Sequence, residues 1–90
     1  MSERYTIEHL IEVAQGDQEL VEELFEAEIL IRDRDLTQID VERCRVAHSL
    51  MRELEVNLAG VEVILRMREE LLTTKRKLAR LAVLVGRAVD

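Results

Sequence analysis

The sequence predicts an all-α protein in which a small helical head precedes a long C-terminal helix that pairs with a second copy. The chain contains no proline, three glycines and only two aromatic residues, so few positions interrupt a helix. From residue 56 onward, apolar residues recur almost to the C-terminus, which is far longer than an ordinary globular helix. A head of this size cannot cover such a helix. We therefore expect a head at residues 1–55 and a dimerisation helix at residues 56–90, forming one structural unit.

The first two elements are predicted to be short helices joined by a tight turn. Thr6 is a good N-cap, and the apolar spacing that follows predicts a helix over about Ile7 to Ala14. Gly16 suits a left-handed turn position, and Asp17 can cap a second helix over about Gln18 to Ala27. Two short helices with a three-residue turn are typical of a helix-turn-helix head.

The second helix is predicted to have two contrasting faces. Residues placed about 100° apart around the axis separate into an apolar side and an acidic side. The apolar side consists of Leu20, Val21, Leu24 and Phe25, and the acidic side of Glu19, Glu22, Glu23 and Glu26.

A connector and a third helix complete the predicted head. The run from Ile29 to Ile31 is β-prone and a polar turn follows it, which predicts the stub of a small β-ribbon, a vestigial wing. Asp40 is predicted to cap a third helix that ends near Leu54. Cys44 lies on its apolar face, where we expect it to act as a small core residue.

The last helix is predicted to begin after Asn57, with Val56 and Val61 at the spacing of a hydrophobic staple. Its apolar residues step by alternating threes and fours, the rhythm of a coiled coil, although Arg68 and Lys75 interrupt it. We expect an antiparallel dimer, with the apolar end of the helix also packing on the partner's head. The predicted interface is Val61, Ile64, Leu65, Arg68, Leu71, Leu72, Leu78, Leu81 and Val85.

The charge is divided unevenly along the chain. The net charge is −6, but residues 1–40 hold twelve acids against three arginines, whereas residues 41–90 hold ten bases against seven acids. The head is therefore acidic and the tail basic.

Other features exclude several classes of protein. The single cysteine rules out an intrachain disulfide, and neither a signal peptide nor an apolar run of membrane-spanning length is present, so we expect a cytoplasmic protein. His9 and His48 lack further ligands at metal-binding spacing. Since no catalytic constellation is present, we expect a protein without enzymatic activity, cofactor or small-molecule substrate.

The region from Tyr5 to Leu78 resembles a MerR-type protein. The resemblance depends on the capped helix pair and the β-prone connector. It also depends on two motifs: Asp-Val-Glu-Arg at residues 40–43, where the third helix begins, and Leu-x-Val-Asn-Leu at residues 54–58, where the last helix begins. Within it, the segment from Leu54 to Glu69 is similar to the heat-shock repressor branch of that class. DNA-binding members carry bases on the second helix and in the wing, but this chain has Glu22 and Glu23 on that helix and a shortened wing at residues 32–35. A surface dense in carboxylates repels DNA.

A related branch shows the same departures, the chaperone-modulator (CbpM-like) family of small MerR-like proteins that bind J-domain co-chaperones. The resemblance implies a dimeric cytoplasmic protein that occupies the basic J-domain surface otherwise used to engage a DnaK-type chaperone. No Lys or Arg lies between residues 17 and 31, which favours a binding face over a merely solvated one. The expected partner-binding residues are Glu19, Glu22, Glu23, Glu26 and Glu28, with Phe25 or Ile29 as an apolar anchor.

Two alternatives remain open at the level of sequence. A transcriptional regulator would contact DNA through Arg32, Arg34, Arg43 and Arg45 instead of the second helix. The tail bases Lys75, Arg76, Lys77 and Arg80 would meet either the acids of the partner chain or a nucleic acid.

Overall fold

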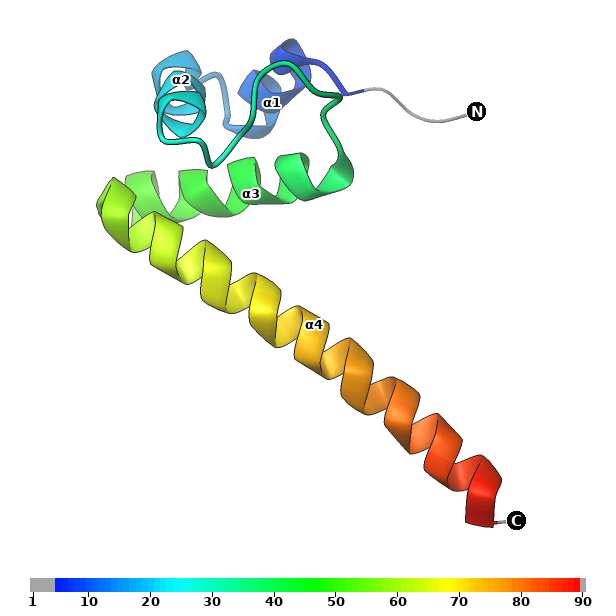
Figure 1. Ribbon diagram of the computed structural model, residues 1–90. Coiled ribbons are helices and arrows are strands. Elements are labelled where there is room, and N and C mark those ends of the chain that lie inside the picture. Colours follow the sequence, from blue (N-terminus) through cyan, green and yellow to red (C-terminus); the bar gives the residue numbers. More distant parts are fainter. Residues whose placement is uncertain (1–4, 90) are drawn as a thin grey trace.

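The computed structural model describes residues 5–89, which form a helical head and one projecting helix (Figure 1). The elements are α1 (Ile7–Val13), α2 (Gln18–Glu26), α3 (Gln38–His48), a π-helical segment η1 (Ser49–Glu53) and α4 (Leu58–Val89). In Figure 1, α1 and α2 lie on one side of α3, and α4 runs from the far end of α3 away from the head. The all-α prediction is confirmed for these residues.

Local capping produces the first two helices. The Thr6 side chain accepts a hydrogen bond from the His9 backbone N–H, and the Asp17 side chain accepts one from the Leu20 N–H, so both predicted caps are confirmed. Between the helices, Gln15 and Gly16 have φ angles of +56° and +84°. Two successive left-handed residues reverse the chain and bring α2 back against α1.

The core of the head is formed where α1, α2, α3 and the start of α4 meet. The four apolar residues predicted for α2 are all buried, as are residues from each neighbouring helix. The Cys44 Sγ atom donates a hydrogen bond to the Leu10 carbonyl oxygen over 3.2 Å, which joins α3 to α1 and confirms Cys44 as a core residue. The core comprises Leu10, Ala14, Leu20, Val21, Leu24, Phe25, Ile29, Leu30, Val41, Cys44, Ala47, Val61 and Leu65.

The expected β-ribbon is absent from residues 5–89, where the connector forms only an isolated bridge between Tyr5 and Leu36. The backbone N–H groups of Ile29 and Leu30 both donate to the Leu24 carbonyl and close the end of α2. Both side chains are buried in the core. Because these residues are committed to the helix end, they cannot pair with a neighbouring strand.

The third helix begins earlier than predicted. Thr37 is its N-cap, and Asp40 occupies the third helical position, where its carboxylate accepts from the Thr37 N–H over 2.7 Å. This is a capping box, so the assignment of Asp40 as the N-cap was wrong. Asp40 is fully buried and also accepts a hydrogen bond from Arg34.

A sharp elbow separates α3 from α4. After His48 the chain widens into the π-helical turn of η1, and Glu55 then adopts a φ of +55°. The Asn57 side chain accepts from the Gly60 N–H over 2.8 Å, which confirms the predicted restart at Leu58.

Only the first part of α4 packs on the head. Val61 and Leu65 are buried there, whereas every side chain described from residue 73 to residue 87 is exposed. The projecting helix gives the protein an elongated shape with extents of 55 × 35 × 21 Å. Among residues 5–89, no helix combines the length and apolarity that crossing a membrane requires.

Candidate functional site

The acidic side of α2 forms an exposed ridge. Glu19, Glu23 and Glu26 follow one another at helical spacing on the side opposite the buried leucines, and Glu22 lies beside them. Glu28 follows the helix end with a φ of +59° and extends the acidic surface toward α4. Glu19, Glu26 and Glu28 are exposed and make no ion pair with any residue in the described part of the chain.

Two arginines border this ridge, and the sequence did not predict either contact. Arg32 donates to Glu22 over 2.7 Å, and its guanidinium lies 4.4 Å from the centre of the Phe25 ring. On the other side, Arg52 donates to Asp17 over 2.6 Å. That hydrogen bond, assisted by the charges of Glu23 and Glu19, raises the pKa of Arg52, and the same bond lowers the pKa of Asp17. The acids therefore remain in excess, because two arginines face six carboxylates: Asp17, Glu19, Glu22, Glu23, Glu26 and Glu28.

Phe25 and Ile29 are too buried to serve as apolar anchors for a partner. Their exposed fractions are 5% and 8%, and Phe25 is further covered by Arg32. Their side chains stabilise the core, so a partner at this surface meets carboxylates and the aliphatic parts of their side chains.

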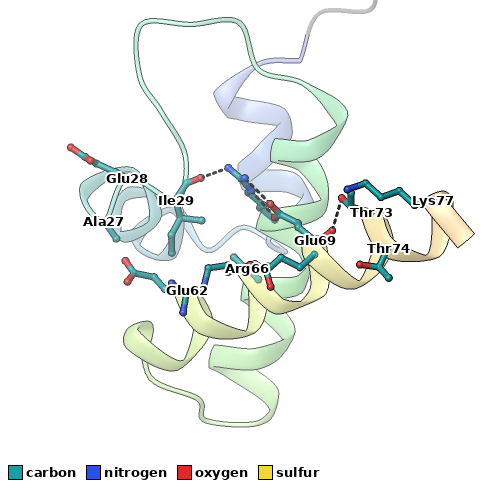
Figure 2. A pocket seen from close by; sticks show the side chains of 12 residues that line it. Ala27, Glu28, Ile29, Glu62, Arg66, Glu69, Thr73, Thr74 and Lys77 are labelled. Atoms are coloured by element: carbon teal, nitrogen blue, oxygen red, sulfur yellow. Dashed lines mark hydrogen bonds and ion pairs between the residues drawn. The ribbon is translucent and has the colours of Figure 1, made fainter.

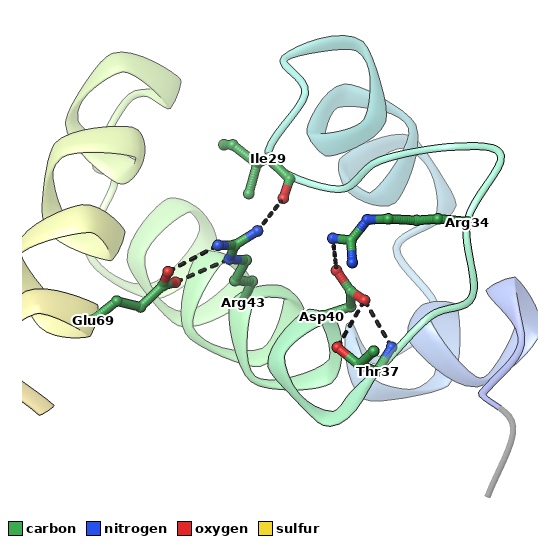
Figure 3. Close-up of polar contacts among 6 residues, drawn as sticks. All are labelled: Ile29, Arg34, Thr37, Asp40, Arg43 and Glu69. Carbon is green, nitrogen blue, oxygen red and sulfur yellow. Dashed lines mark hydrogen bonds and ion pairs between the residues drawn. The ribbon is translucent and has the colours of Figure 1, made fainter. Parts of the chain in front are cut away.

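A clamp between α3 and α4 fixes the position of the acidic surface (Figure 3). The Arg43 guanidinium donates twice to the Glu69 carboxylate, over 2.8 and 2.9 Å, and once to the Ile29 carbonyl over 3.0 Å. The hydrogen bonds with Arg43 lower the pKa of Glu69, and the same pairing raises the pKa of Arg43. One side chain thus ties together α3, α4 and the end of α2.

A groove lies beside this clamp, between the end of α2 and α4 (Figure 2). Its volume of about 690 Å³ would suit a small molecule, but its lining is dominated by ionic side chains instead of apolar ones. The carboxylates that line it continue the acidic surface from α2 onto α4, and three cations also line it. The ionic residues are Glu28, Glu62, Glu69, Glu70, Arg43, Arg66 and Lys77.

All four arginines considered for DNA contact are paired with carboxylates. Arg45 donates to Glu42 over 2.7 Å, and Arg34 donates to the buried Asp40 over 3.1 Å. Arg32 is bound by Glu22, and Arg43 by Glu69. Pairing within the chain reduces the positive charge that these residues can offer to phosphates.

The structure divides the residues predicted for dimerisation into three groups. Val61 and Leu65 are buried in the core of their own chain, at 0% and 4% exposure, so they do not belong to an interface with a second copy. Arg68 binds Glu42 of the same chain over 3.4 Å, and Ile64 and Leu72 are partly buried. The remaining four are between 56% and 61% exposed: Leu71, Leu78, Leu81 and Val85.

Little in the described residues favours catalysis or metal binding. Burial raises the pKa of the Cys44 thiol to about 11, so the group stays protonated near neutral pH and is a poor nucleophile. No group of three or more His, Cys, Asp or Glu side chains is arranged to hold a metal ion within residues 5–89.

Comparison with known proteins gives no relative on which to base a function. No protein-family model, curated protein or solved structure matches this chain.

Proposed function

We propose that this protein is a non-enzymatic regulatory binding protein that uses the acidic ridge of α2 to bind the basic surface of a J-domain co-chaperone. The observation that carries this proposal is the excess of six carboxylates over two arginines on and beside one short, well-capped helix. The choice of a J-domain partner depends on the sequence resemblance. We further propose that the protein acts in the cytoplasm as a homodimer formed through α4.

The geometry indicates how such a partner would be recognised. Because Phe25 and Ile29 are buried, the ridge lacks a large exposed apolar anchor, and attraction between opposite charges becomes the main source of specificity. Such binding is steered at long range and weakens as salt screens the charges.

Charge reversal at the two exposed ends of the ridge tests the proposal. Glu19→Lys with Glu26→Lys is preferable to changing Glu22, because Glu22 holds the arginine that covers Phe25. Titration of a J-domain co-chaperone from the same organism, followed by fluorescence anisotropy, should show affinity at least about tenfold weaker, which is about 1.4 kcal/mol.

A matched control separates local recognition from net charge. Glu8→Lys with Glu12→Lys makes the same charge change on α1, where both residues are exposed. We expect this variant to bind within about a factor of two of the wild type at physiological salt. Equal affinity of the ridge variant and the wild type would refute the assignment of the ridge.

A DNA titration tests the alternative function. Pairing of Arg32, Arg34, Arg43 and Arg45 with carboxylates weighs against a DNA-binding surface in the head. We expect only weak binding to promoter DNA at low salt. Tight binding with a steep dependence on salt would instead support a transcriptional regulator.

A further inference from the structure

An apolar stripe runs along α4, and the packing of the helix on the head fixes which way this stripe faces. Because Val61 and Leu65 face the head, the helix can only present other residues to a second chain. Residues that alternate at spacings of three and four define one stripe, which begins at the partly buried Ile64, is exposed from Met67 onward and contains a single threonine. We call it the α4 stripe: Ile64, Met67, Leu71, Thr74, Leu78, Leu81 and Val85.

The α4 stripe differs from the seam predicted from the sequence. The predicted rhythm included Arg68 and Lys75, whereas the α4 stripe has Met67 and Thr74 in their place. Arg68 points instead toward α3, where it contacts Glu42. Met67, which was not predicted as an interface residue, is 60% exposed.

We propose that the α4 stripe pairs with the α4 stripe of a second copy, antiparallel and in one defined register. In that register Ile64 lies opposite the partner's Leu81, Met67 opposite the partner's Leu78, and Leu71 opposite the partner's Thr74. This inference deepens the homodimer of the proposed function and depends on it.

The distribution of charge favours the antiparallel orientation. The head is acidic, whereas α4 carries five bases and no acid between Glu70 and residue 89. An antiparallel pair places each acidic head beside the basic half of the other chain, while a parallel pair would bring two acidic heads together. The five bases are Lys75, Arg76, Lys77, Arg80 and Arg87.

Residues that flank the α4 stripe favour one register. In the proposed register, Glu70 of each chain lies beside the partner's Lys77, which creates two attractive pairs related by symmetry. On the opposite flank Arg68 approaches the partner's Lys75, but Glu42 on α3 of the same chain already binds Arg68.

A register shifted by one heptad is electrostatically worse. It would place Met67 opposite the partner's Val85, and each chain's Lys75 and Lys77 would then meet the same lysines of the other copy. It would also move Glu70 away from every partner cation near the seam. Like charges across a coiled coil act against a register, so the shifted arrangement is disfavoured.

Cysteine cross-linking tests orientation and register together. The double variant Met67→Cys with Leu78→Cys places the two thiols opposite each other across the proposed dimer, and mild oxidation should convert most of the protein to a covalent dimer. Each single variant should stay uncrosslinked, because identical positions lie eleven residues, or about 16 Å, apart along the antiparallel helices. Both residues are about 60% exposed in the single chain, so the head should fold normally, which circular dichroism can verify.

The remaining outcomes would overturn the proposal in identifiable ways. Cross-linking by Leu78→Cys alone would indicate a parallel pair. Cross-linking by the double variant Met67→Cys with Val85→Cys, without cross-linking by Met67→Cys with Leu78→Cys, would indicate the shifted register. The wild type is the control for Cys44, which is buried and should not react. Light scattering separates the two proposals, because a dimer without the expected cross-link refutes the register alone, whereas a monomer at all concentrations refutes the homodimer as well.

Discussion

Replacement of Glu69 by glutamine tests how α4 is attached to the head. Glu69 accepts two hydrogen bonds from Arg43, and Arg43 in turn holds the Ile29 carbonyl (Figure 3). Glutamine keeps the size of the side chain but removes its charge, so Arg43 loses its ionic partner while the packing is preserved. We therefore expect a loss of stability without a change of fold.

The size of the effect follows from the exposure of the pair. A fully exposed ion pair contributes about 0–1 kcal/mol, and hydrogen bonds to charged groups contribute about 1.5–3 kcal/mol where they are shielded from water. The side chains of Arg43 and Glu69 are 27% and 35% exposed, so solvent screening places this pair between those limits. We expect Glu69→Gln to lower the free energy of unfolding by about 1 kcal/mol, or the melting temperature by roughly 4–8 °C.

The effect should also depend on pH. The pKa of Glu69 is lowered in the folded state, so the unfolded carboxyl, with a pKa near 4.5, takes up a proton first as the pH falls. Proton uptake then favours unfolding. The stabilising contribution is therefore complete well above pH 4.5 and is lost as the pH falls through the lowered folded pKa. The stability gap between the wild type and Glu69→Gln should be constant near neutral pH and should shrink below pH 4.5.

Urea unfolding at fixed protein concentration provides the measurement, because dimerisation would make the apparent stability depend on concentration. Glu62→Gln is the matched control, since Glu62 lies two turns earlier on α4, is exposed and makes no ion pair among the described residues. It should change stability by less than about 0.5 kcal/mol. A Glu69→Gln variant as stable as this control, or a gap that does not vary with pH, would refute the clamp.

Three further substitutions test other parts of the structure. Gly86→Ala should stabilise α4 by up to about 1 kcal/mol, because a Cβ atom there meets nothing within 4 Å. Gly60→Ala should give no such gain, because its Cβ would lie 2.7 Å from Val56 Cγ1. Thermal unfolding of both variants checks this. Glu55→Gly should raise the free energy of unfolding by roughly 0.5–1 kcal/mol because φ is +55° at this position, and urea titration would contradict this if stability fell. Leu71→Glu should produce a folded monomer by light scattering, since it places a charge in the α4 stripe, and a dimer of unchanged stability would exclude the stripe as the interface.

Features with a short-range signal were predictable from the sequence. The caps at Thr6, Asp17 and Asn57 each need only a side chain and a backbone N–H three residues away, and all three are present. The buried face of α2 was equally predictable, because helical periodicity separates its leucines from its glutamates. The orientation of this ridge toward solvent follows from the same pattern.

Features that depend on distant residues were not predictable. Arg43 and Glu69 are 26 positions apart, and Asp17 and Arg52 are 35 apart, so no local pattern links them. The rotation of α4 was misjudged for a related reason, because both Val61 and the exposed leucines are apolar and periodicity alone cannot say which of them the head covers. Only the packed head shows that Val61 belongs to its own core.

The arginines of the head form ion pairs within the described part of the chain, whereas the basic residues of the tail do not, and this difference connects the two proposals. Every arginine described in residues 30–60 is bound to a carboxylate, whereas none of the five bases from Lys75 to Arg87 forms an ion pair within the described chain. In the antiparallel register these tail bases lie alongside the first half of the partner's α4, which carries Glu62 and Glu70. They would offset the acidic charge at the groove beside α4. The acids on α2 itself do not line that groove, so they keep their surplus: Glu19, Glu22, Glu23 and Glu26. The ridge, not the groove, is therefore the surface of the dimer best suited to attract a basic protein.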